Sequence, residues 1–320
     1  MEPDGIAAAG RNACYALDVI SSSANDANGK ANSRCLFEGD VKLMVKKTLY
    51  LTSLMSDNEG PMFEAWAHYI EEQTGISVST VDRIRWKERE QLLDAGGIDI
   101  AWICGLPYVL RADEPDPGIE LLAAPVMAGK RYENQPIYFS DVVVHKDSSF
   151  NKFTDLKGAS WAYNEPYSHS GYNVVRHHLF EMGQTGIYFG RVVESGSHLV
   201  SLQMILRHEV DASAIDSIVL EIELRHNPAI RSELKIIESL GPSPIPPLVI
   251  SRKLPLETRE MLRDVLIRMD ANPSGREALV GMQVSRFTPI TDSDYDIIRH
   301  MYRKSKDVRL QPSPINKFAP

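Results

Sequence analysis

Cysteine is scarce in this sequence, and the three that occur lie far apart. Cys14, Cys35 and Cys104 form neither a CxxC pair nor the even, regularly spaced set of a disulfide-stapled domain. We therefore expect neither a disulfide framework nor a metal site built from thiolates. Cys104 ends the apolar run 100–104, where a buried structural thiol is more common than a nucleophile.

Basic residues are also in deficit. The chain has 35 Lys and Arg against 43 Asp and Glu, which gives a formal net charge of −8 at pH 7. Proteins that bind nucleic acid or anionic membranes in bulk normally carry a basic surface, so neither partner is expected. A small anion can still bind, but only at a local site.

Long apolar segments, internal repeats and heptads are missing as well. No window approaches the roughly 18 apolar residues that a membrane-spanning helix needs. With 320 residues, 43% hydrophobic content and 24% charge, the chain is long enough for two lobes of ordinary domain size.

The first 43 residues differ from the rest of the chain. They carry scattered acidic residues and a Ser/Ala/Asn/Gly-rich section at 21–33, and they lack the apolar core with a basic flank that marks a secretory signal. Met44 leads through two lysines into a strand-like segment, so one hypothesis takes Met44 as the natural start. We expect residues 1–46 to be irregular or disordered.

From Lys47 onward, strand-like and helix-like patterns alternate, which is typical of an α/β protein with a parallel or mixed sheet covered by helices. Apolar stretches predict strands at 48–54, 78–81, 98–103, 142–145, 192–194, 210–215 and 248–251. Apolar residues at helical spacing predict helices at 61–73, 86–93, 174–182, 199–206, 255–269 and 295–302, with a short helical turn at 153–158.

Ligands of open α/β sheets bind beyond the carboxyl ends of strands. Two such ends predict contact loops, one at Ser53 to Ser56 and one at Cys104 to Tyr108, where we expect Gly105 and Pro107 to break the strand. The proline-rich stretch 241–247 is stiff enough for a crossover between lobes. The proline-rich tail from Leu310 is expected to be a surface arm.

The segment 162–172, AYNEPYSHSGY, places hydroxyl groups and a glycine just before a predicted helix. The first N–H groups of a helix lack intrahelical acceptors, and its dipole is positive at that end, so the turn from Ser168 to Gly171 suits a phosphate, phosphonate or sulfonate. An ordinary helix cap explains the same residues, because a serine before a helix more often binds its own backbone. The pattern alone leaves both interpretations open.

Several strings occur in a fixed order along the chain. They are DIAW at 99–102 with Tyr108, FTDLKG at 153–158, SHSGY at 168–172, GSH at 196–198, and VDA at 210–212 followed by Asp216. Together they resemble the substrate-binding proteins of phosphonate, phosphite and phosphate ABC transporters. The resemblance covers roughly residues 48–269 and implies a type 2 periplasmic binding protein fold.

In that fold two lobes, each a mixed sheet flanked by helices, enclose a ligand cleft. The resemblance implies that residues 47–140 and 248–320 form the first lobe and that residues 141–247 form the second. It also implies the groups that would hold the ligand. They are Ser168, His169, Ser170 and Gly171 in the turn, His198 at the start of the next helix, Asp216 and Tyr108. From the residues themselves, Tyr163 beside the turn is a further candidate as an aromatic wall, as are Ser53 and Met55 in the first predicted contact loop.

Two of these positions have specific chemistry. Asp216 would repel a bare dianion but would pair with an ammonium group, as on an aminoalkylphosphonate; it could equally cap a helix. His169 departs from the family, which usually has Ser or Thr there. The substitution loses a small hydroxyl but adds a charge-assisted donor if the ring is protonated.

The resemblance implies a non-catalytic solute-binding component of an ABC importer, which closes on a small phosphorus oxyanion and presents it to a membrane permease. We expect a monomer without metal or cofactor, extracytoplasmic by resemblance, although the missing signal leaves a cytoplasmic location open. The alternatives are a sulfonate or thiamine-precursor binder and a cytosolic cofactor-biosynthesis enzyme on the same fold. The best acid/base pair for an enzyme is His169 with Glu165. A ligand-sensing regulator would need a DNA-binding segment, which residues 1–43 do not supply.

Overall fold

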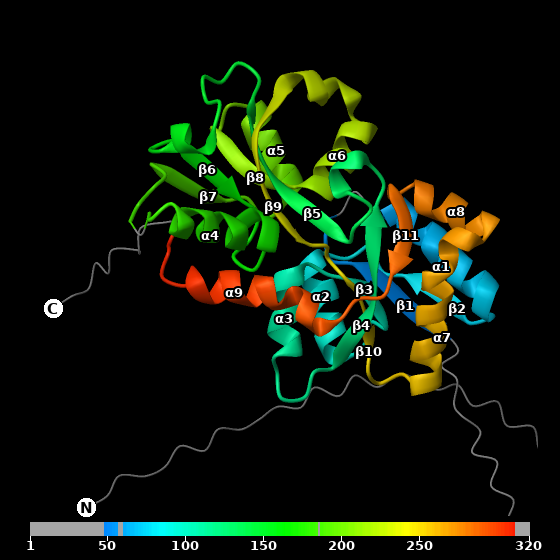
Figure 1. The fold of residues 1–320 in the computed structure, drawn as a ribbon. Helices are drawn as coiled ribbons and strands as arrows, with labels where there is room; N and C mark the ends of the chain where they lie inside the picture. Colours follow the sequence, from blue (N-terminus) through cyan, green and yellow to red (C-terminus); the bar gives the residue numbers. More distant parts are fainter. Residues whose placement is uncertain (1–47, 57–59, 185, 311–320) are drawn as a thin grey trace, which may run out of the picture. The chain divides into compact units, whose positions relative to one another are not determined.

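The computed structural model describes residues 48–56, 60–184 and 186–310, whose strands form two sheets (Figure 1). The first sheet has the order β11 (Val284–Thr288), β4 (Ile119–Met127), β10 (Leu248–Ser251), β3 (Ile100–Trp102), β1 (Thr48–Ser53) and β2 (Ser77–Thr80). The second has the order β7 (Arg191–Glu194), β6 (Ser160–Tyr163), β8 (Ala212–Asp216), β5 (Ile137–His145) and β9 (Leu234–Pro244).

Helices cover both faces of the first sheet, which is mixed because β1 runs parallel to β2 and β3 whereas β10 is antiparallel to β3. One face packs against α1 (Gly60–Thr74), α7 (Leu256–Ile267) and α8 (Pro273–Val280), and the other against α2 (Trp86–Ala95), α3 (Gly105–Ala112) and α9 (Asp296–Lys304). Successive side chains of a strand point to opposite faces, so Ile100 and Trp102 enter one core and Ala101 enters the other.

The second sheet is built in the same way. Its β6 is parallel to β7 and β8, and β5 is antiparallel to β8 and β9. One face packs against α4 (Val174–Glu181) and the other against α5 (His198–Leu206) and α6 (Ser217–His226). Val142 and Val144 of β5 belong to the α4 core, whereas Val143 faces α5, so a continuous valine run is buried on both sides.

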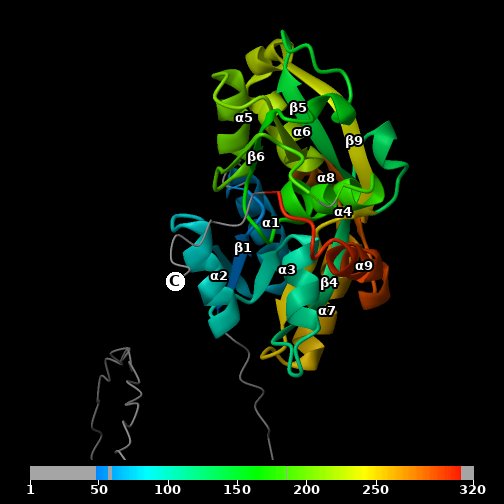
Figure 2. The same cartoon turned by 90° about the vertical axis from the view of Figure 1, so that its left-hand side faces the viewer.

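Two chain crossings and one helix join the sheets. The chain passes from β4 to β5 through the short helical turn η2 (Lys130–Tyr132), and it returns through residues 245–247. Helix α9 contacts α3 on one side and α4 on the other (Figure 2). Arg176 of α4 strengthens this link, because its guanidinium donates to the carbonyl oxygens of Ser305 and Val308, just after α9.

The structure confirms the predicted fold class of mixed sheets flanked by helices. The first sheet takes strands from residues 48–127 and 248–288, and the second from residues 137–244. Residues 137–140 thus already belong to the second sheet, and the lobe boundaries after residues 140 and 247 stay a prediction. In the described part of the chain no helix is both long and apolar enough to cross a membrane.

One local prediction is wrong. Residues 105–108 are not a loop but the first turn of α3, which begins directly after Cys104. Proline is tolerated in a first helical turn, where its missing N–H has no intrahelical acceptor anyway, so Pro107 does not break this helix.

Several elements were missed, among them β4, β9, β11, α6 and α8. Residues 241–244 of the predicted crossover pair with β5 as the end of β9, which leaves residues 245–247 to cross. The predicted irregular segment 1–46 lies outside the described residues, as does the predicted surface arm except for Leu310, which is buried.

Candidate functional site

The turn at Ser168 is a capped helix start. The Ser168 hydroxyl accepts the N–H of Gly171 at 3.0 Å, and its carbonyl oxygen accepts the N–H of Asn173 at 2.9 Å. The π-helical turn η4 (His169–Asn173) follows and runs directly into α4. The positive end of this helix therefore lies at the predicted anion-binding turn.

Gly171 is required by close packing. A Cβ atom at this position would lie 2.0 Å from Oδ1 of Asn164 and 3.1 Å from Cε1 of His198. A side chain cannot fit without moving these groups, so glycine at this position lets Asn164 and His198 lie close to the backbone of the turn. Oδ1 of Asn164 has no hydrogen-bond partner among the described residues.

A second helix start meets the first one here. Ser197 caps α5 by accepting the N–H of Val200 at 3.2 Å, and His198 is the first residue of that helix. Nε2 of His198 lies 3.1 Å from the hydroxyl of Ser170, while its Nδ1 finds no partner within the described part of the chain. Burial lowers the pKa of His198 to about 4, so the ring is neutral at pH 7.

A third helix starts at Asp216. Its Oδ1 accepts the N–H of Ile218 at 2.8 Å and caps α6, whereas Oδ2 is buried and meets no partner in residues 48–310 as described. The pKa of Asp216 is raised to about 7, first by burial and further by the charges of Asp141 and Glu221. A cation brought to this carboxyl group would favour its charged form.

The three helix starts are connected through β5. The hydroxyl of Ser140 donates to the carbonyl oxygen of Ser170 at 2.6 Å, and Ser140 is paired with Asp216 in the sheet. Tyr138 lies two residues earlier, on the same face of the strand. Its buried hydroxyl is close to Ser170 and Cys104 but meets neither with hydrogen-bond geometry.

Cys104 reaches this group from the first sheet. It ends the segment after β3, and its Sγ accepts the N–H of His169 at 3.3 Å, so the two lobes touch at the first amide of η4. Burial raises the pKa of Cys104 to about 11, which keeps it a thiol. The expectation of a buried, unreactive thiol agrees with this environment.

A cavity of about 30 Å³ lies between the lobes beside His198. The first lobe lines it with Leu54, Met55, Ser56, Trp86 and Arg89, and the second with Asn164, Glu165, Gly196, Ser197 and His198. Burial raises the pKa of Glu165 to about 7, and the nearby charge of Glu90 on α2 adds to this effect. Such a volume holds about one water molecule.

The side chain of His169 makes its hydrogen bonds to residues other than Ser170, His198 and Asp216. The ring is fully buried, with Nε2 3.0 Å from the hydroxyl of Ser243 and Nδ1 3.1 Å from the side-chain nitrogen of Asn173. Burial lowers its pKa to about 3, so the expected charged donor is not present at neutral pH. His169 contributes its backbone to the turn and its ring to the core.

The hydroxyl groups of the two predicted tyrosines are bonded to acidic side chains. The hydroxyl of Tyr108 donates to Asp292 at 2.7 Å, and its ring packs on Tyr295 with centroids 4.8 Å apart. Tyr163 donates to Glu194 at 3.1 Å and packs in the second lobe. Of the two remaining predicted residues, Met55 lines the cavity, and the hydroxyl of Ser53 accepts the N–H of Met55 at 3.0 Å.

Sequence reasoning thus missed several groups that the structure brings to this place. They are Cys104 as a contact of the turn, Tyr138, Ser140, Asn164, Trp86 and Arg89. Tyr138 and Ser140 could have been found only as two polar side chains that alternate along a strand and so lie on the same face of it. The described residues hold no cluster of three or more His, Cys, Asp or Glu that is arranged for a metal ion.

Comparison with known proteins identifies the family. The model of the phosphonate ABC transporter, periplasmic substrate-binding protein family matches residues 50–295. A phosphonates-binding periplasmic protein of Escherichia coli K12 is 23% identical over 249 residues, which are 76% of this chain and 72% of that protein.

Two solved structures show the same fold. A binding-protein component of a phosphonate ABC transporter from Pseudomonas aeruginosa has a TM-score of 0.72 at 22% identity, over 82% of this chain and 87% of that one. A Prochlorococcus marinus protein in complex with methylphosphonate has a TM-score of 0.70 at 20% identity, over 82% of this chain and 99% of that one. The resemblance drawn from the sequence is confirmed, and the chain belongs to the family of periplasmic substrate-binding proteins of phosphonate ABC transporters.

Proposed function

We propose that this protein is a non-catalytic, monomeric, extracytoplasmic receptor that closes on a small phosphorus oxyanion and delivers it to the permease of an ABC importer. The observation that carries the proposal is the start of η4. There the amide of His169 meets Cys104 of the opposite lobe, the amide of Gly171 donates to Ser168, and the hydroxyl of Ser170 pairs with His198. An anion at this point is held by a helix amino end and is covered from both sides.

The proposed grip on the oxyanion uses hydroxyl and N–H donors. Ser170 and the neutral ring of His198 share a hydrogen bond, which leaves this pair one hydrogen to donate to the ligand, and the first amides of η4 add further donors. Burying the charge of an Arg or Lys costs roughly several kcal/mol in desolvation. Neutral N–H and O–H donors bind an anion without this cost. Selectivity then depends on the geometry of the donors.

Entry of the ligand requires motion of the lobes. The cavity of about 30 Å³ is small, so we expect the lobes to separate when a phosphonate enters. Hinge closure around a ligand is the motion known for periplasmic binding proteins. The contact of Cys104 with the amide of His169 joins the two lobes, and it breaks when they open.

The surroundings of His169 argue against the enzymatic alternative. Its ring is bonded to Ser243 and Asn173 and is uncharged, so the one acid/base pair that the sequence offered, His169 with Glu165, is not assembled. The carboxyl group of Asp216 suits a ligand that carries an ammonium group, which favours aminoalkylphosphonates within the proposed class.

A thermal-shift screen tests the proposal. The ligands are phosphate, phosphite, methylphosphonate, 2-aminoethylphosphonate, a sulfonate and a thiamine precursor. A ligand that binds only the native state raises the melting temperature by mass action. We expect a response to at least one phosphorus compound. A response to the sulfonate or the pyrimidine with none to any phosphorus compound would replace the proposed ligand.

A further inference from the structure

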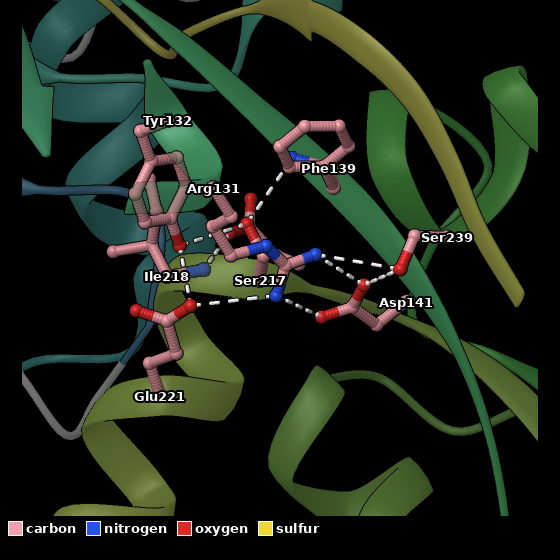
Figure 3. Close-up of polar contacts among 9 residues, drawn as sticks. Arg131, Tyr132, Phe139, Asp141, Ser217, Ile218, Glu221 and Ser239 are labelled. Carbon is pink, nitrogen blue, oxygen red and sulfur yellow. Dashed lines mark hydrogen bonds and ion pairs between the residues drawn. The ribbon is translucent and has the colours of Figure 1, made fainter. Parts of the chain in front are cut away.

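Arg131 holds two carboxylates behind the site. It lies in η2, between the two sheets, and its guanidinium forms two parallel bonds to the fully buried Asp141, at 2.7 and 3.0 Å (Figure 3). The same guanidinium lies 3.4 Å from Oε1 of Glu221 on α6. Ser239 completes the arrangement by donating to Asp141 at 2.6 Å.

The network also fixes the first turns of α6. The hydroxyl of Tyr132 donates to Glu221 at 2.7 Å and lies 3.3 Å from the hydroxyl of Ser217. Ser217 in turn accepts the N–H of Phe139 at 3.1 Å. Because Asp216 is the cap of this helix and directly precedes Ser217, the orientation of its carboxyl group depends on these contacts.

The charges of the network act on Asp216 as well. Asp141 and Glu221 both raise the pKa of Asp216, in addition to burial. Cys104 and Tyr138 also lie near Asp216, and both are neutral at pH 7 because burial raises the pKa of each. Arg131 is bonded to both carboxylates and offsets their charge, so it opposes their effect on Asp216.

We propose that Arg131 is a positioning residue that sets the charge and orientation of Asp216 and thereby the preference of the site for ligands with an ammonium group over ligands without one. The inference rests on the proposed function. In the wild type, Arg131 keeps Asp216 available as an anion near neutral pH. Without Arg131, two uncompensated carboxylates hold the proton on Asp216, and the advantage of the cationic ligand is lost.

The test compares two ligands over a range of pH. Isothermal titration calorimetry gives the Kd of methylphosphonate and of 2-aminoethylphosphonate from pH 5.5 to 9, roughly the range in which Asp216 titrates. The ratio of the two Kd values is followed in the wild type, Arg131→Lys, Arg131→Met and Glu221→Gln. The ionisation of the two ligands themselves is the same in every experiment. A difference in the Kd ratio between variants therefore comes from the protein.

Three controls accompany these variants. Glu233→Gln removes one negative charge at an exposed position of the second lobe, where Glu233 pairs with Lys146. Asp216→Asn removes the titrating group itself. Arg131→Met leaves Asp141 buried without its cation and can fail to fold. Glu221→Gln carries the test in that case, because glutamine still accepts the bond from Tyr132.

Glu221→Gln is expected to lower the pH midpoint of the Kd ratio by roughly half to one unit, and Arg131→Met to raise it by a similar amount. Arg131→Lys is expected to lie between wild type and Arg131→Met, and Glu233→Gln to match wild type. Equal midpoints in wild type, Glu221→Gln and the folded Arg131 variants would overturn the inference. If the wild type binds neither phosphonate, the proposed function itself fails, which is a separate outcome.

Discussion

The hydroxyl of Ser170 lies 3.1 Å from Nε2 of His198, and this pair joins the starts of two helices at the cleft between the lobes. Both side chains are buried, and burial holds the pKa of His198 at about 4. The pair is therefore uncharged at neutral pH and keeps one hydrogen to donate, which suits the proposed oxyanion site.

Ser170→Ala should weaken the binding of a phosphonate. The variant loses a hydroxyl donor to a charged oxygen, which corresponds to about 1 to 3 kcal/mol of binding free energy. Calorimetric titration measures the change. Ser232→Ala is the matched control, because its exposed hydroxyl is bonded to the carbonyl oxygen of Ala229. Equal affinities of the two variants would remove the turn from the site.

Gly171→Ala should disrupt the site and lower the melting temperature. The new methyl group would lie 2.0 Å from Oδ1 of Asn164, and overpacking of this kind costs about 1 to 3 kcal/mol of stability. Removal of the clashing oxygen by Asn164→Ala in the double variant should restore part of that loss in a double-mutant cycle.

A control for this pair is Gly186→Ala, where an added Cβ meets nothing within 4 Å. The melting temperature of this control should stay near that of the wild type. If Gly171→Ala behaves like Gly186→Ala in both stability and affinity, the close approach of Asn164 to the turn is wrong.

These predictions depend on groups that the sequence identified to different degrees. Ser168, Ser170 and Gly171 could be found because a cap, a hydroxyl and a glycine at fixed spacing before a helix are local signals. His198 lies directly before a predicted helix, so it too had a local signal. Asp216 was implied only by the resemblance, because α6, the helix that it caps, was not predicted. All five are brought together by the structure.

Contacts between the lobes had no local signal. Cys104 meets the turn although 65 positions separate it from His169, and a lone cysteine in an apolar run does not indicate its partner. The hydrogen bond between the ring of His169 and Ser243 had no local signal either, because 74 positions separate the two residues. The bond of Tyr108 to Asp292 was not foreseen, since residues 105–108 were predicted as a loop and form a helix.

Asp216→Asn should stabilise the protein in the absence of ligand, and more so as pH rises. The folded-state pKa of about 7 lies above the ordinary value of 3.8, so between these values the native state holds the extra proton and stability falls as pH rises. Asparagine still caps α6 and does not titrate. The gain at pH 8 should reach roughly 2 to 4 kcal/mol, and it should vanish near pH 4.

Urea unfolding at several pH values measures this difference. The expected signature is a stability difference between variant and wild type that grows from pH 4 to pH 7 and is constant above it. A difference that does not vary with pH would mean that Asp216 titrates normally in the folded protein.

His169→Gln should reduce the loss of stability in acid. The folded-state pKa of His169 is about 3, far below the ordinary 6.5, so the unfolded chain takes up a proton below pH 6.5 that the native state does not. Stability is then lost as pH falls from 6.5 toward 3. Without this group, the slope of the unfolding free energy against pH should decrease by up to about 1.4 kcal/mol per pH unit.

Glutamine can still reach Ser243, and His226→Gln at an exposed position is the control. The slope should stay unchanged in the control. An unchanged slope in His169→Gln would contradict the burial of a neutral ring at this position.

The decisive measurement is calorimetric titration of the wild-type protein with methylphosphonate and 2-aminoethylphosphonate. We expect saturable binding of one phosphonate per chain, weakened by Ser170→Ala and unaffected by Ser232→Ala. Absence of binding by both phosphonates, by phosphite and by phosphate, in a protein that unfolds cooperatively, would contradict it.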